Sequence, residues 1–323
     1  MFSNSYMNNP NQSEKQRFLY IDIARCVAML WIVGWWHLIQ YSPNYERFSF
    51  QGDEFITNLM LGLFMFLSGL LLGRKEINNW NRVKEFYKNR FLRFYILYAI
   101  SALTFPVIGY NREPALLFTT LTATSSIFLP QPVTLWFMSM LAFFYLLTPL
   151  IKKQIVLLGG ALLLIFIILH FVIHQGVDTR LFLYFPLYVS GLGCAQIRTF
   201  YKIIGTKICL ALSFVLSCLL FYFTLRYSWM VYVFVPAGVV FVLSLSHMIE
   251  FEFLKPVVSF LAFSSLCAYL FHRQIYAAVC IGLEFLGFNH PLWVCFLLLF
   301  PICILCSYFL QKMYDLLLGF FKK

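Results

Sequence analysis

Charged residues are scarce in this chain of 323 amino acids: only 11% are Asp, Glu, Lys or Arg, while 61% are hydrophobic. A soluble domain contains about 25% charged residues. The sequence also lacks a polar stretch long enough to form a separate soluble domain. These absences exclude an ordinary soluble globular protein and predict that most of the molecular surface faces lipid.

Several sequence motifs with known chemistry are also absent. There is no glycine-rich nucleotide-binding loop, internal repeat or low-complexity tract. The nine cysteines lie in apolar segments without the paired spacing of zinc ligands, so they predict neither a zinc site nor a disulfide framework. His170 and His174 lie one helical turn apart with no carboxylate nearby, a pattern that favours interfacial histidines. We therefore expect no metal.

The first 16 residues are polar and rich in Asn, Gln and Ser. They lack the charged segment, short apolar core and small-residue cleavage site of a secretory signal peptide. We expect residues 1–16 to form a disordered cytoplasmic tail, followed by a single membrane domain over residues 17–323.

Long apolar runs dominate the rest of the chain. About 20 apolar residues in a helix cross the hydrocarbon core of a bilayer. The sequence therefore predicts an all-α, polytopic membrane protein with about ten transmembrane helices, over residues 18–40, 54–73, 91–110, 133–151, 154–173, 181–198, 205–225, 228–248, 257–282 and 291–313. Residues 114–130 contain many Thr and Ser residues and are expected to form a re-entrant or interfacial piece.

Lys and Arg residues predict the orientation of these helices, because cytoplasmic loops carry an excess of them. With the N-terminus in the cytoplasm, the opposite side of the membrane has only Arg47, Arg112, Arg180 and Arg226 of the 24 Lys and Arg residues. Both termini are therefore expected to be cytoplasmic. The net charge of +11 follows from this bias and calls for contact with membrane lipid rather than with nucleic acid.

The first helix carries three ionisable side chains: Asp22, Arg25 and His37. Such groups are costly inside a membrane and usually serve a function. Asp22 and Arg25 are three residues apart and can pair on one helical face, or Arg25 can extend to the cytoplasmic interface. His37 could act as a base near neutral pH, although the residues alone favour an interfacial histidine beside Trp35 and Trp36.

Other polar positions have alternative explanations as well. The basic stretch from Arg74 to Arg93 fits ordinary anchoring to anionic lipid, or capture of a phosphate-bearing donor by Arg90 and Arg93. Ser68 could serve small-residue helix packing. His272 and Arg273 form a second buried polar position.

Taken in order, these features resemble the acyltransferase-3 family of membrane acyltransferases, and within it the fucose-4-O-acetylase-like polysaccharide acetyltransferases. The similar motifs span nearly the whole chain: Tyr20 to Arg25 followed by His37; Phe64-Met65-Phe66-Leu67-Ser68-Gly69; Asn89-Arg90-Phe91-Leu92-Arg93; Thr134-Leu135-Trp136-Phe137; Phe185-Pro186-Leu187-Tyr188 with Gly191; and Ser264 to His272.

The resemblance implies a bacterial cytoplasmic-membrane enzyme. Such an enzyme takes an acyl group, usually acetyl, from cytoplasmic acyl-CoA and delivers it to a hydroxyl of a surface polysaccharide or its lipid-linked precursor. Acetyl-CoA would be the donor substrate. The acceptor glycan, the hydroxyl position, the choice between acetyl and succinyl, and the presence of homo-oligomers all stay open.

The resemblance also implies roles for particular residues. His37 would be the general base, with Arg25 and Asp22 completing the catalytic set. Arg90, Arg93 and Ser68 would bind acyl-CoA. The acceptor substrate would contact residues of the later motifs, namely Trp136, Tyr269, His272 and Arg273.

One departure from the family pattern has a structural consequence. The family places ten residues between the helix-one Arg and His, whereas eleven separate Arg25 from His37. In a regular α-helix this change moves the two from about 20° to about 120° apart around the axis. A π-bulge or a kink near Gly34 is therefore predicted if the two act on one face.

A multi-helix transporter or flippase of a glycolipid or small metabolite is the competing hypothesis, since buried charges are common in transporters. Inverted repeats or pairs of broken helices would favour it, and the sequence contains neither in convincing form. Acyl transfer is therefore the preferred interpretation.

Overall fold

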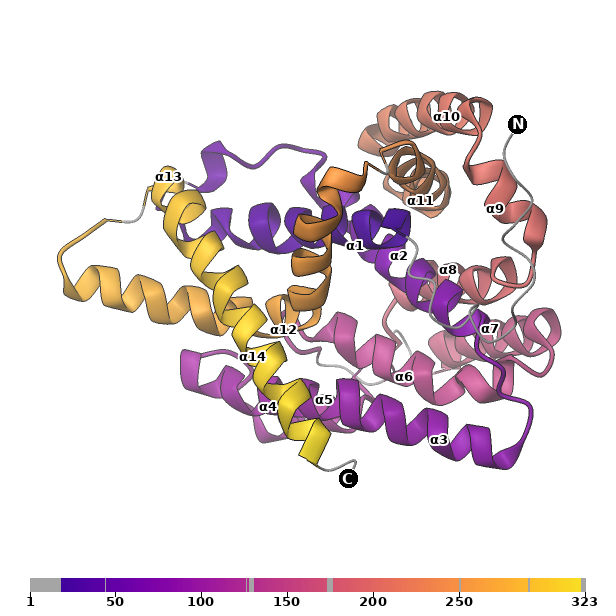
Figure 1. The fold of residues 1–323 in the computed structure, drawn as a ribbon, viewed down its shortest axis with the longest axis horizontal. Helices are drawn as coiled ribbons and strands as arrows, with labels where there is room; N and C mark the ends of the chain where they lie inside the picture. The colour runs from indigo at the N-terminus through magenta and orange to yellow at the C-terminus, as the bar shows by residue number, and fades with distance from the viewer. Residues whose placement is uncertain are drawn as a thin grey trace.

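The computed structural model describes residues 19–43, 45–125, 127, 131–172, 177–249, 251–289 and 291–320. All regular structure within these ranges is helical (Figure 1). The predicted all-α class is thus confirmed for the described part of the chain. Residues 1–16, expected to form a cytoplasmic tail, and His174 lie outside it.

The first third of the chain contains helices α1 to α5. Helix α1 passes without a break into the π-helix η1, and the 3₁₀ turn η2 follows one residue later. The elements of this part are α1 (Leu19–Trp31), η1 (Ile32–His37), η2 (Ile39–Tyr41), η3 (Tyr45–Arg47), α2 (Asp53–Gly73), α3 (Trp80–Arg90), η4 (Phe91–Tyr95), α4 (Ile96–Thr104), η5 (Phe105–Ile108) and α5 (Pro114–Leu121).

The remainder of the chain contains helices α6 to α14. Its elements are α6 (Trp136–Ile151), α7 (Ile155–Val172), α8 (Leu181–Cys194), α9 (Arg198–Ile204), α10 (Lys207–Arg226), η6 (Ser228–Met230), α11 (Val231–Met248), η7 (Glu252–Leu254), α12 (Lys255–Phe285), α13 (Leu292–Val294), η8 (Cys295–Leu299) and α14 (Phe300–Phe320).

Eight helical segments of the described residues are long and apolar enough to cross a membrane. Two further apolar helices, α6 and α8, are shorter. Together these segments match the predicted hydrophobic runs one for one. In a bilayer the backbone must satisfy its own hydrogen bonds, which forces such runs into helices. The protein is therefore a polytopic, all-α membrane protein.

The third predicted segment begins earlier than expected. The sequence predicted a helix over 91–110, whereas a continuous helical segment runs over Trp80–Ile108. The Asn79 side chain accepts a hydrogen bond from the Arg82 backbone N–H and caps the start of α3. The polar residues of α3 hide this helix from a search for apolar runs. Of the segment 114–130, only α5 is helical among the described residues.

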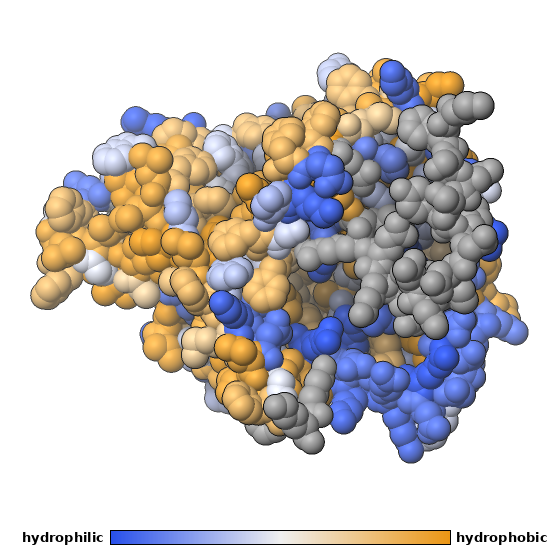
Figure 2. All heavy atoms as spheres, in the orientation of Figure 1, coloured by the Kyte–Doolittle hydropathy of each residue, from blue (hydrophilic) through white to orange (hydrophobic). Residues whose placement is uncertain are grey.

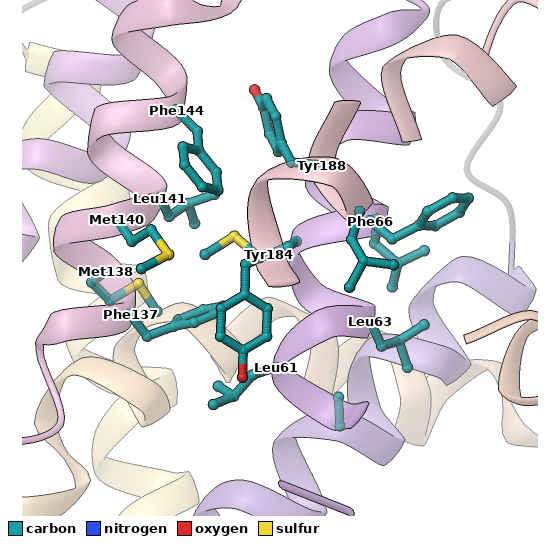
Figure 3. Close-up of a cluster of buried hydrophobic side chains, with 14 of the residues drawn as sticks. Leu61, Leu63, Phe66, Phe137, Met138, Met140, Leu141, Phe144, Tyr184 and Tyr188 are labelled. Carbon is teal, nitrogen blue, oxygen red and sulfur yellow. The ribbon is translucent and has the colours of Figure 1, made fainter. Parts of the chain in front are cut away.

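Glycines allow α2 and α8 to pack with their backbones in contact. A Cβ atom on Gly69 would lie 2.1 Å from the Tyr188 carbonyl oxygen, and one on Gly191 would lie 2.2 Å from the Phe66 carbonyl oxygen. Small residues permit such close helix approach in membranes. Figure 3 shows side chains of α2, α6 and α8 that meet to form a buried apolar cluster at this contact.

The C-terminal end of α2 is held by Lys152, the residue that follows α6. Its ammonium group donates to the carbonyl oxygens of Leu72 and Gly73 at 3.2 and 3.1 Å, and also to that of Lys75. The last carbonyls of a helix lack the usual partner four residues further on, and a cation beside them interacts favourably with the helix dipole. Burial lowers the pKa of Lys152 from its ordinary value, while Glu76 acts in the opposite direction.

The surface of the molecule separates by polarity. Figure 2 shows a broad hydrophobic area on the left, where Figure 1 places the ends of α12 and α13, and a hydrophilic area at the lower right around α3. Large apolar side chains are exposed along α7, α10 and α14, including Val156, Ile208 and Phe309. Such faces are stable against lipid rather than water, which agrees with the membrane assignment.

Candidate active site

The first helix is irregular where the spacing predicted irregularity. Its α-helical part ends at Trp31, and residues Ile32–His37 form the π-helix η1 around Gly34. A π-turn accommodates one more residue than an α-turn, which offsets the extra residue between Arg25 and His37. The predicted π-bulge is confirmed.

The structure brings His37 into contact with α12 and gives Arg25 a cavity that α12 also lines. Arg25 lines a cavity beside Ala262 and Ser265 of α12. His37 contacts His272, ten residues after Ala262 on the same helix. The two side chains of helix one are thus aligned along one partner helix, at different depths.

His37 and His272 are joined directly. His37 Nδ1 lies 2.8 Å from His272 Nε2, within hydrogen-bond distance. The ring planes differ by 9° and the ring centroids are 4.7 Å apart, so the rings meet through their nitrogen-bearing edges. His37 is 8% exposed and His272 is 0% exposed. This pair is formed by residues 235 positions apart in the chain.

A cavity of about 520 Å³ lies on the side of α12 that faces Arg25. Its volume is within the range of small-molecule binding sites. Three arginines, Arg25, Arg90 and Arg93, line it together with one carboxylate, that of Asp315. Its apolar and hydroxyl-bearing lining includes Phe64, Ser68, Phe137, Leu141, Tyr145, Ser265 and Tyr269.

The arginines of this cavity are positioned differently from one another. Arg25 lies 3.8 Å from Asp22, the distance of a loose ion pair, as the spacing in helix one predicted. The Arg90 guanidinium lies 5.0 Å from the ring centroid of Tyr145, in cation–π contact. None of the ion pairs found among the described residues involves Arg90 or Arg93. These two cations are thus available to an anionic ligand.

Tyr269 links the cavity to the histidine pair. Its side chain lines the cavity, and its ring centroid lies 6.0 Å from that of His272. The Tyr269 hydroxyl donates to the Thr134 carbonyl oxygen at 3.2 Å. A ligand in contact with Tyr269 would therefore lie one aromatic ring away from His272.

A second polar cluster holds the chain beyond the histidines. Arg273 donates from Nε to the Thr134 hydroxyl at 3.1 Å and from Nη2 to Gln40 Oε1 at 2.9 Å. The Tyr41 hydroxyl donates to the Arg273 carbonyl oxygen. Thr134 has a φ of 64°, in the left-handed region that β-branched residues avoid. Such strain persists where surrounding contacts enforce it, often at functional sites.

Trp136 lies beside a third group. The Arg180 guanidinium is 3.5 Å from the Trp136 ring centroid, and the Asp178 carboxylate accepts from Arg180 Nε at 3.0 Å. The Tyr184 ring packs at 5.8 Å from Trp136. Trp136 is not among the residues that line the cavity.

The structure therefore brings most of the sequence-predicted residues together and separates others. Arg25, Ser68, Arg90, Arg93 and Tyr269 share one cavity. The residues that line it do not include His37, His272, Arg273 or Trp136. Both ring nitrogens of His272, for which the resemblance implies substrate binding, contact protein atoms in the structure.

Some residues of the site carried no signal of their own in the sequence. Asp315 and Gln311 come from the last helix and reach the cavity through the packing of α14 on α12. Thr134 was noted only as the first residue of a motif. Within the described residues, no cluster of three or more His, Cys, Asp or Glu side chains has the arrangement of a metal site.

Comparison with known proteins decides the broad class. A sequence model of a protein family, described as an acyltransferase domain, matches residues 18–312. The chain belongs to the acyltransferase-3 family. No curated protein and no solved structure matches it.

The family assignment indicates which kinds of substrate the site must bind. The acyltransferase is a multi-pass membrane enzyme, and it must therefore bind an acyl donor and an acyl acceptor. The matched region contains every predicted site residue, from Asp22 to Arg273. The cavity and the histidine pair are both built from this region, apart from Asp315, Leu318 and Gly319 at the end of α14.

Proposed function

We propose that this acyltransferase moves an acyl group, by default acetyl, from cytoplasmic acyl-CoA to a hydroxyl of a surface glycan or its lipid-linked precursor. This is the reaction of the fucose-4-O-acetylase-like members that its motifs resemble. The observation that carries the proposal is the continuity of the site. Tyr269 belongs to the wall of a cavity lined by three arginines, and its ring packs against that of His272, the partner of His37.

The arginines of the cavity would bind the acyl donor. Acyl-CoA carries several phosphate charges, which arginine binds through charge-assisted hydrogen bonds. Arg90 and Arg93 lie where α3 passes into η4, next to the loop that the Lys and Arg distribution places in the cytoplasm. The apolar wall with Phe64 and Leu141 would accommodate the pantetheine arm and acyl chain.

His37 accounts for the proton transfer. The acceptor hydroxyl oxygen attacks the thioester carbonyl carbon while its proton moves to His37. The tetrahedral intermediate then expels the CoA thiolate as the carbon–sulfur bond breaks. The thiolate takes the proton from His37, which leaves an ester, free CoA and a neutral histidine.

The two substrates approach from opposite sides. His37 lies twelve positions beyond Arg25, toward the face of the membrane opposite the termini. The helices and charges predict both termini to be cytoplasmic, so the donor would enter beside Arg25 and the acceptor beside His37. The enzyme would then act in the bacterial cytoplasmic membrane, where acyl-CoA and surface-glycan precursors are separated by one bilayer.

The test is transfer of label from [¹⁴C]acetyl-CoA to glycan and lipid fractions of membranes that contain the protein. His37→Ala should lower the rate at least about 100-fold, because general-base catalysis contributes about 10²–10⁴-fold. The matched control is His170→Ala on α7, outside the cavity, which should keep the wild-type rate. Label transfer that survives in His37→Ala would contradict the proposal, as would solute uptake without any transfer.

A further inference from the structure

The hydrogen-bond partners of His272 determine where its proton lies. His272 Nδ1 lies 2.8 Å from the Tyr269 carbonyl oxygen and 3.1 Å from that of Ala268. A carbonyl oxygen only accepts hydrogen bonds, so Nδ1 must carry the proton. In a neutral imidazole the other nitrogen, Nε2, then has a free lone pair and can only accept.

That arrangement dictates the protonation of His37 in turn. Its Nδ1 faces His272 Nε2 at 2.8 Å. Because His272 Nε2 accepts, His37 Nδ1 must donate and carry the proton. His37 Nε2 is then unprotonated, with its lone pair directed away from His272. This is the nitrogen that a general base needs.

We propose that His272 is a positioning residue that holds His37 in the tautomer with a proton on Nδ1 and a free Nε2. The proposal rests on the proposed role of His37 as the base and assigns to His272 a task within the same reaction. His272 touches neither substrate. Its Nδ1–H donates to two α12 carbonyl groups, so its Nε2 accepts from His37 Nδ1. This leaves His37 Nε2 unprotonated.

Burial strengthens the effect of His272 on the tautomer of His37. His272 is fully buried and His37 is 8% exposed, so little water can compete for the hydrogen bond that joins the two rings. With the opposite tautomer, His37 would present an N–H to the acceptor hydroxyl and its lone pair to His272, and no base would remain. When Nε2 takes the hydroxyl proton, the His37 imidazolium donates to neutral His272 through a charge-assisted hydrogen bond.

The rings around the pair restrict its movement. The Tyr269 and Tyr276 rings lie on α12 at centroid distances of 6.0 and 5.9 Å from His272. The Tyr276 hydroxyl donates to the Val33 carbonyl oxygen inside the π-helix. This bond ties the segment that carries His37 to the helix that carries His272.

A matched pair of variants distinguishes this positioning role from a role of His272 in packing alone. In His272→Gln the new side-chain amide could place an acceptor near the former Nε2 position, whereas in His272→Asn the shorter amide reaches only the former Nδ1 position. The glutamine variant should retain kcat within about 10-fold. The asparagine variant should lose about 10²–10⁴-fold in kcat, the effect expected for loss of an oriented base. The KM for acetyl-CoA should be unchanged in both.

Equal kcat values in the two variants, at equal protein levels in the membrane, would overturn the proposal. If the variants do not accumulate in the membrane, a second measurement on the wild-type protein tests the proposal. Nitrogen NMR of protein labelled with [¹⁵N]histidine distinguishes protonated from unprotonated ring nitrogens. A His37→Gln sample identifies the His37 signals by their loss, and a His272→Gln sample does the same for His272.

At a pH where both rings are neutral, the proposal requires a protonated Nδ1 and an unprotonated Nε2 on both histidines. A protonated Nε2 on His37 would overturn it. This measurement does not depend on activity. If His37 has the required tautomer but His37→Ala retains label transfer, the proposed function fails while the assigned hydrogen-bond pattern stands.

Discussion

The site has two halves that differ in how their polar groups are held. We call the cavity lined by Arg25, Arg90 and Arg93 the inner half, and the cluster of His37, His272 and Arg273 the outer half. In the inner cavity, Arg90 and Arg93 line open space, and neither joins an ion pair among the described residues. In the outer half, His37, His272 and Arg273 contact protein partners at 2.8–3.1 Å. One half has charge available for a ligand, and the other has its polar groups fixed in place.

This difference indicates that one half of the site binds the donor and the other carries out the catalytic step. Cations without ion-pair partners suit a ligand that arrives with negative charge, and binding supplies their missing interactions. Polar groups held by each other suit catalysis, because the geometry needs no rearrangement when the reaction occurs. We therefore expect changes in the inner half to alter mainly the KM for acyl-CoA, and changes in the outer half to alter mainly kcat.

The largest effect should come from breaking the alignment of the two halves along helix one. An alanine inserted after Trp36 would rotate His37 away from α12 and should lower kcat by at least about 100-fold, since small displacements of catalytic groups have effects of that size. Deletion of Trp36 removes the residue that the π-helix accommodates and leaves the family spacing of ten. This variant should retain activity within about 10-fold of wild type.

Both variants are assayed with labelled acetyl-CoA, and their membrane levels are measured by immunoblotting. A deletion as harmful as the insertion would show that the π-helix has a role other than restoring the spacing.

A smaller effect is expected from removing one cation of the inner half. Arg93→Ala should raise the KM for acetyl-CoA about 10- to 100-fold with little change in kcat, because a hydrogen bond to a charged group contributes about 1.5–3 kcal/mol. Arg82→Ala is the control, since Arg82 is exposed, pairs with Glu76 and does not line the cavity. A fall in kcat at constant KM would break the comparison.

The smallest effect is expected from a conservative change in the outer half. Arg273→Lys keeps the charge but cannot hold Thr134 and Gln40 with the same fork of donors. We expect kcat to fall about 10-fold or less and the KM for acetyl-CoA to stay constant. Steady-state kinetics over a range of acetyl-CoA concentrations measures both quantities. A raised KM would place Arg273 in donor binding instead.

The membrane class and most helix positions could be predicted from the sequence, since long apolar runs can satisfy their backbone groups in a bilayer only as helices. The π-helix was predictable as well, because eleven residues between Arg25 and His37 do not fit one face of a regular helix. The start of α3 at Trp80 was not, because a capped polar helix forms there without a hydrophobic signal.

Which polar groups meet depends on the packing of the helices. His37 and His272 are 235 residues apart, and no local pattern encodes their hydrogen bond. The same is true of Asp315, which enters the cavity because α14 packs on α12. Local sequence determines which residues are costly to bury, whereas helix packing selects the partners that satisfy them. In this packing His272 is the hydrogen-bond partner of His37.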